Sequence, residues 1–119
     1  MYTLDTNICI ALLKGVADLK KQLLSLSPSD VSVTSVVRAE LLFGARNSQK
    51  VADNLRCLQV FLHPFQSLVF DDVAADHYGR IRSQLQAQGH PIGGNDMLIA
   101  ATALAHEAIL VTRNTREFS

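Results

Sequence analysis

The sequence predicts an α/β fold built around a parallel sheet of about four strands. Short apolar or β-branched segments alternate with helical segments along the chain, and this alternation is typical of parallel strands joined by helical crossovers. Hydrophobic residues make up 48% of the 119 residues, which is enough to bury one core. We therefore expect a single domain that spans residues 1–119.

The expected strands are short and rich in apolar or β-branched residues, as strands of a parallel sheet usually are. They are Met1–Leu4, Val31–Thr34, Ser67–Phe70 and Ala108–Thr112. Ligands of such sheets bind beyond the carboxyl ends of the strands. Residues that follow these segments are therefore candidates for a functional site.

Helices are expected in the intervening segments. They are Ile8–Leu13, Ala17–Leu24, Val36–Ala45, Val51–Phe61, Asp71–Gln88 and Asn95–Ala105. The clearest is Asp71–Gln88, whose apolar residues recur on one face and which Gly89 should end. That face consists of Ala74, Tyr78, Ile81 and Leu85. We expect Ser35 to cap the third helix, and the last helix, apolar nearly all round, to be buried on several sides.

The net charge does not indicate a nucleic-acid binder. It is formally +0, whereas such proteins are often basic. Any phosphate-binding surface must therefore be local. Arg80 with Arg82 is one candidate pair, and Arg113 with Arg116 is another. The simpler interpretation of either pair is a solvated helix face or loop.

Cysteine usage and hydropathy point to a cytoplasmic protein. Cys9 and Cys57 do not make a disulfide framework, and no secretory signal precedes them. No apolar run reaches the roughly 18 residues that a membrane span needs. We expect both thiols to be reduced, Cys9 to lie in the core, and the protein not to enter a membrane.

Four acidic residues lie where the topology could bring them to one edge of the sheet. They are Asp5, Glu40, Asp96 and Glu117. Mg²⁺ prefers oxygen ligands and typically takes one or two carboxylates. Such an ion lowers the pKa of a bound water and neutralises charge that develops on a phosphodiester. No His or Cys cluster has zinc spacing.

Each of these acids also has a purely structural explanation. Asp5 and Asp96 could each cap a helix, and Glu40 could be an ordinary exposed helix residue. Glu117 could be a surface residue or part of a capping box after Asn114. Position alone therefore predicts no more than an acidic cleft that could bind a metal.

Four stretches resemble, in order, the motifs of PIN-domain ribonucleases of the VapC toxin type. They are Leu-Asp-Thr-Asn-Ile at 4–8, Ala-Glu-Leu-Leu-Phe-Gly-Ala at 39–45, Pro-Ile-Gly-Gly-Asn-Asp-Met-Leu-Ile-Ala-Ala at 91–101, and Val-Thr-Arg-Asn-Thr-Arg-Glu-Phe at 111–118. The resemblance covers essentially the whole chain. One such motif would be weak, but four in order are specific.

The resemblance implies a PIN-like three-layer α/β/α fold with a central parallel sheet. It also implies a Mg²⁺- or Mn²⁺-dependent endoribonuclease, the toxin half of a type II toxin–antitoxin pair that a VapB-type antitoxin inhibits. Members of the family commonly form homodimers, and many cleave tRNA. The branch with Asn-Thr-Arg-Glu-Phe endings includes enzymes that cut initiator tRNA.

Matching the motifs residue by residue implies roles for individual side chains. Asp5 and Asp96 are then the metal ligands, and Glu40 completes the acidic pocket. Thr6 would orient Asp5 through its hydroxyl group. Many relatives place an Asp where this chain has Asn114, so Glu117 is expected to supply the fourth carboxylate.

Two other functions remain open at this point. The neutral Asn114 allows a catalytically impaired PIN fold that serves as a partner-binding module. A phosphotransferase with Asp5 as nucleophile would ordinarily need a second acid two residues on, where Asn7 stands. The segment Val51–Phe65 carries more apolar surface than one core stripe needs, and either the core or a dimer or antitoxin groove could use it.

Overall fold

The computed structural model describes residues 1–90 and 92–112, and these residues contain one sheet of parallel strands. The strands are β1 (Tyr2–Leu4), β2 (Val31–Thr34), β3 (Gln66–Leu68) and β4 (Ile109–Val111). Their order in the sheet is β3-β2-β1-β4, and all neighbouring pairs are parallel. In the register, Tyr2 of β1 lies between Val31 and Ile109. The expected α/β fold is confirmed.

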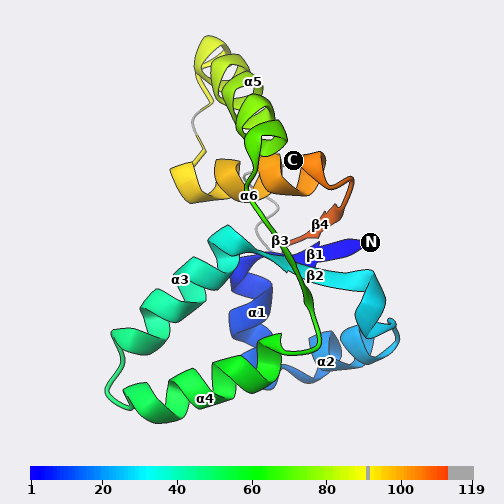
Figure 1. Cartoon of the computed structure of the whole chain (residues 1–119), viewed down its shortest axis with the longest axis vertical. Helices are drawn as coiled ribbons and strands as arrows, with labels where there is room; N and C mark the ends of the chain where they lie inside the picture. Colours follow the sequence, from blue (N-terminus) through cyan, green and yellow to red (C-terminus); the bar gives the residue numbers. More distant parts are fainter. Residues whose placement is uncertain (91, 113–119) are drawn as a thin grey trace.

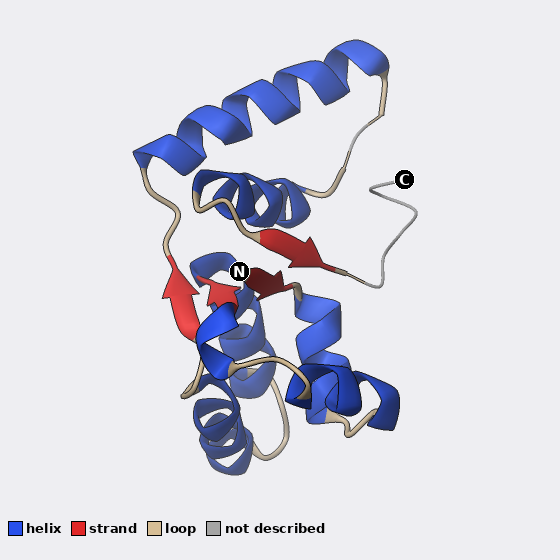
Figure 2. Ribbon diagram, turned by 90° about the vertical axis from the view of Figure 1, so that its right-hand side faces the viewer, coloured by secondary structure: helices blue, strands red, loops and turns tan. Residues whose placement is uncertain are grey.

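Helices cover both faces of this sheet. They are α1 (Thr6–Leu13), α2 (Ala17–Leu24), α3 (Ser35–Arg46), α4 (Val51–Leu62), α5 (Asp72–Gln88) and α6 (Gly94–Ala105), with a short 3₁₀ helix, η1, at Pro28–Asp30. Figures 1 and 2 show α5 and α6 on one side of the sheet and the other helices on the opposite side. The three layers that the family resemblance implies are therefore present. No helix in the described part of the chain is long and apolar enough to span a membrane.

The core lies around β2, whose four residues are all buried. Apolar side chains of α1, α3 and α6 pack with it, including Ile8, Val37 and Ile99. Two buried hydroxyl groups fix β1 to β2: Thr3 Oγ1 donates to the Ser32 carbonyl at 3.2 Å, and Ser32 Oγ donates to the Tyr2 carbonyl at 3.0 Å. Because buried polar groups are costly without partners, these bonds help to fix the end of β1.

The helix cap after β2 lies one residue earlier than expected. Thr34 has extended backbone angles, and its Oγ1 accepts a hydrogen bond from the Val37 N–H at 3.2 Å. Ser35 is already the first helical residue, so the prediction that Ser35 caps α3 is wrong. Its hydroxyl group instead donates to the Leu68 carbonyl at 3.2 Å, which joins the start of α3 to the end of β3.

Helices α5 and α6 pack against each other as the apolar patterns predict. Asp71 caps α5 by accepting the Ala74 N–H at 2.9 Å, and Gly89 ends the helix with a φ of 70°. The left-handed conformation at Gly89 suits a residue without a Cβ. Helix α6 buries residues on several sides, although Leu104 near its end is 52% exposed.

The Asp71 cap provides a test of this local structure. Replacing Asp71 with Ala should lower the free energy of unfolding by about 1 kcal/mol, because the Ala74 N–H loses its acceptor. Asp72→Ala is the matched control, since Asp72 lies in the first turn but does not cap the helix. Urea unfolding measures both. Equal losses for the two variants would contradict the assignment of Asp71 as the cap.

Candidate active site

Asp5 lies at the junction between β1 and α1 and is held there by both elements. Its backbone N–H donates to the Val111 carbonyl of β4 at 3.1 Å, and its backbone carbonyl accepts from the Cys9 N–H. Its Oδ1 accepts the Ile8 N–H at 2.9 Å, so it caps α1. Among the described residues this bond occupies only Oδ1. Asp5 therefore caps a helix and still has a carboxylate oxygen for a ligand.

Cys9 lies one turn along α1 from Asp5, and its thiol is buried. Burial raises the pKa of Cys9 to about 12; the negative charge of Asp5 adds to the rise, and the positive charge of Arg38 opposes it. The thiol is therefore protonated at neutral pH. A protonated, buried thiol is neither a nucleophile nor a metal ligand, so the donors of this region are oxygen atoms.

Glu40 of α3 is connected to α1 by a hydrogen bond. Thr6 Oγ1 donates to Glu40 Oε1 at 2.9 Å. The Thr6 hydroxyl, which the resemblance implies as a positioning group for Asp5, donates here to Glu40, while the Asp5 side chain turns back to cap α1. The bond constrains the Glu40 carboxylate and leaves Oε2 without a described partner.

A cavity of about 510 Å³ lies where α1, α3 and α6 meet, beside the Thr6–Glu40 hydrogen bond. Thr6 and Ile10 of α1, Ala39, Glu40 and Phe43 of α3, and Asn95 of α6 are among its lining residues. The motifs at 4–8, 39–45 and 91–101, which are far apart in the sequence, thus each contribute to one cavity. Thr6, Glu40 and Asn95 give the cavity its polar groups, and apolar side chains make up most of its lining.

Asp96 follows Asn95 in the first turn of α6. The cap of that helix is Gly93, and Asp96 is the third helical residue, so Asp96 is not the N-cap. Its Oδ2 lies 3.6 Å from the point that a Cβ on Gly93 would occupy. A negative charge in the first turn is favoured by the helix dipole, and the distance to the Gly93 position is that of an ordinary van der Waals contact.

The remaining predicted site residues, Asn114 and Glu117, lie outside the described residues, as do Arg113 and Arg116. Residues 1–90 and 92–112 contain no group of three or more His, Cys, Asp or Glu side chains that could hold a metal ion. Mg²⁺ commonly uses only one or two protein carboxylates, and the available donors are hard oxygen atoms. The chemistry of the donor set therefore fits a divalent cation of that kind.

Apart from Thr6 and Glu40, the lining residues of the cavity were not singled out from the sequence, and Phe43 and Asn95 are two of them. Phe43 is 70% exposed although it is large and apolar, and it follows Glu40 by three residues, on the same side of α3. Asn95 precedes Asp96 directly. The signal for both was present in their spacing from the acids, because neighbours at such spacing share a helix face or turn.

Comparison with known proteins places the chain in a family. Residues 2–119 match the PIN domain. The "tRNA(fMet)-specific endonuclease VapC" of Shigella flexneri is 38% identical over 98% of this chain and 89% of its own length. "Ribonuclease VapC2" of Rickettsia felis is 37% identical over 99% of this chain and 90% of its own length.

Solved structures agree with the sequence comparison. The chain in the crystal structure of VapBC2 from Rickettsia felis bound to a promoter DNA fragment superposes with a TM-score of 0.93, at 36% identity over 98% of this chain and 90% of that one. DNA-bound VapBC from Salmonella typhimurium also gives 0.93, at 34% identity over 98% and 89%. The chain therefore belongs to the PIN domain family, and within it to the VapC ribonucleases.

The burial of Cys9 leads to a test of the site's electrostatics. With a pKa of about 12, Cys9 at pH 8 is ionised in on the order of one molecule in ten thousand, whereas Cys57 is exposed. A thiol reagent at pH 8 should therefore modify Cys57 in the folded protein and reach Cys9 only in denaturant. The Cys57→Ser variant isolates Cys9, and rapid labelling of that folded variant would contradict this description.

Proposed function

We propose that this chain is a divalent-metal-dependent endoribonuclease that acts as the toxin of a type II toxin–antitoxin pair. The observation that carries the proposal is the cavity in which Thr6, Glu40 and the first turn of α6 meet. There the Glu40 carboxylate and the Thr6 hydroxyl supply oxygen atoms, which suit a cation and the phosphodiester that the cation would attract. Membership of the VapC ribonucleases supports the same activity.

In this proposal Asp5 and Asp96 hold a Mg²⁺ ion, with Mn²⁺ as a substitute. The bound ion supplies positive charge that stabilises the phosphodiester as negative charge develops on it. Glu40 is oriented by Thr6, and its Oε2 accepts the proton of the attacking water. Glu117 and Asn114 belong to the fourth motif, and in this proposal Glu117 supplies a further carboxylate.

The substrate and partners follow from the relatives. Two of them, from Shigella flexneri and Salmonella typhimurium, bear the name tRNA(fMet)-specific endonuclease. We therefore assign tRNA, and initiator tRNA in particular, as the substrate of this chain. VapBC complexes recur among the similar structures, so a VapB-type antitoxin is the proposed inhibitor. A cytoplasmic homodimer completes the proposal.

A second candidate is a catalytically impaired PIN fold that only binds partners. It is favoured by the neutral Asn114 and by the described residues' lack of a group of three metal-binding side chains. Such a protein would bind a VapB-type antitoxin but would not hydrolyse RNA. Incubating the antitoxin-free protein with RNA and Mg²⁺ separates the two functions.

Substitution of the proposed metal ligands tests the catalytic site. Asp5→Asn and Asp96→Asn should each reduce cleavage of total RNA in Mg²⁺ by at least about 100-fold, since even residues that merely orient metal ligands cost 10–100-fold. Asp18→Asn, an exposed acid on α2, is the control and should keep full activity. Cleaved ends are mapped by sequencing. Full activity of either ligand variant at equal folding would overturn the assignment.

The Thr6–Glu40 hydrogen bond gives a separate prediction for the positioning of the acid. Thr6→Val removes the donor but keeps the shape, and it should lower the cleavage rate by about 10-fold, because hydrogen bonds to charged groups contribute about 1.5–3 kcal/mol. Thr6→Ser keeps the hydroxyl and should restore most of the rate. If the Val and Ser variants cleave RNA equally fast, Thr6 does not position Glu40.

A further inference from the structure

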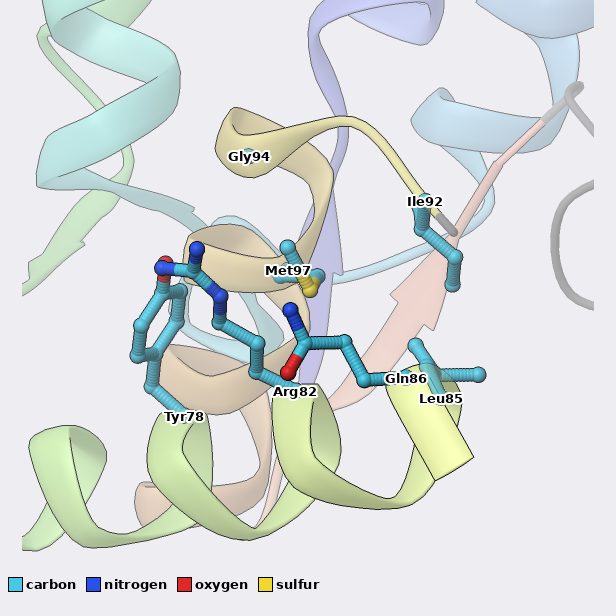
Figure 3. A pocket seen from close by; sticks show the side chains of 7 residues that line it. All are labelled: Tyr78, Arg82, Leu85, Gln86, Ile92, Gly94 and Met97. Atoms are coloured by element: carbon cyan, nitrogen blue, oxygen red, sulfur yellow. The ribbon is translucent and has the colours of Figure 1, made fainter. Parts of the chain in front are cut away.

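A second cavity lies between α5 and α6, with a volume of about 310 Å³. Figure 3 shows Arg82 and Gln86 reaching from α5 toward the first turn of α6, with Tyr78 beside Arg82. Met97 and Ile92 contribute apolar groups from the other side. The cavity therefore combines a phenol, a guanidinium and an amide with an apolar wall.

The two arginines of α5 differ in what balances their charge. Arg80 Nε pairs with Asp76 Oδ2 at 3.1 Å on the exposed face of the helix, which is the solvated arrangement expected for an ordinary surface charge. Arg82 has no acidic partner among the described residues, and its Nη1 donates to the Tyr78 hydroxyl at 3.1 Å. The positive charge of Arg82 is thus presented to the cavity.

This combination of groups matches a nucleobase. Unpaired RNA bases are recognised by stacking on aromatic rings or guanidinium planes and by hydrogen bonds to their edges. The Arg82 guanidinium supplies paired donors for base acceptors, and the Gln86 amide supplies both a donor and an acceptor. Met97 and Ile92 offer an apolar surface for the flat face of a base.

The cavity also lies beside the proposed catalytic centre. Gly94 and Met97 line it, and Asp96 stands between them in the same turn of α6. Each residue advances a helix by only about 1.5 Å along its axis, while neighbouring side chains point about 100° apart, so Asp96 lies near the cavity without lining it. A base bound here would belong to a nucleotide close to the phosphodiester that is cleaved at the metal held by Asp96.

We propose that the cavity between α5 and α6 is a subsite for one unpaired base of the RNA substrate, read at its edge by Arg82 and Gln86. This inference rests on the proposed ribonuclease function, which it extends from the reacting phosphodiester to the choice of sequence. Arg82 and Gln86 determine specificity, and Tyr78 holds the guanidinium in place.

Binding without cleavage tests the proposal directly. Fluorescence anisotropy in EDTA compares hexaribonucleotides of adenosine, cytidine, uridine and inosine, the last of which presents the same O6 and N7 acceptors as guanosine. The wild-type protein should discriminate between the best and worst base by about 10-fold, as one good edge contact allows. Arg82→Ala and Gln86→Ala should each reduce that ratio to about 3-fold or less, and Arg80→Ala should leave it unchanged.

Controls address folding and charge. Thermal unfolding establishes that each variant is folded. Arg82→Lys keeps the positive charge but loses the planar fork, so it should retain the salt dependence of binding while losing base discrimination. Equal base discrimination in the wild type and in Arg82→Ala, or none in the wild type, would overturn the proposal.

Cleavage in Mg²⁺ separates this inference from the proposed function. A wild-type protein that discriminates between bases but cleaves no RNA would refute the ribonuclease function and leave the subsite standing. A protein whose cleavage preference is the same with Arg82→Ala would refute the subsite and leave the function standing. If Arg82→Ala instead releases a bound VapB-type antitoxin with base discrimination unchanged, the cavity binds protein and the proposal is wrong.

Discussion

The double anchoring of Asp5 is the constraint on which the site depends. The hydrogen bond from its backbone N–H to Val111 fixes it to the sheet, and the bond from Ile8 to its carboxylate fixes it to α1. The residue thus sets where β1 ends and where α1 begins. Asp5 is only 8% exposed, yet its carboxylate has an oxygen without a described partner. It therefore combines a structural role with a negative charge at the carboxyl edge of the sheet.

The other features of the site follow from that junction. Starting α1 at Thr6 lets its hydroxyl group reach Glu40 on α3, so the Glu40 carboxylate is bonded to the residue that directly follows Asp5. The charge of Asp5 also helps to keep the Cys9 thiol protonated, which leaves oxygen atoms as the donors. Helix α6 reaches this cavity from the opposite side of the sheet. Asn95 lines the cavity, and Asp96 is the next residue in the chain.

The sequence was sufficient for the fold because each element carries its own periodicity or boundary residue. Val31–Thr34 was predicted with its observed limits, and Gly89 ends α5 as expected. Errors arose where two neighbouring residues could fill the same role. Thr34 and Ser35 both carry a hydroxyl group that can cap a helix, and only the backbone angles decide which of them does. Likewise, the partner of Thr6 depends on how the Asp5 side chain turns, which is a tertiary property. The unequal roles of Arg80 and Arg82 depend on which neighbour each side chain reaches, and composition does not show that.

A metal titration is the most direct test of the central claim that Asp5 and Asp96 form a cation site. Isothermal titration calorimetry of the antitoxin-free protein with Mn²⁺ should show saturable binding, and Asp5→Asn should abolish it while the variant retains its fold. Equal Mn²⁺ binding by the wild type and Asp5→Asn, or no binding by the wild type, would contradict the account.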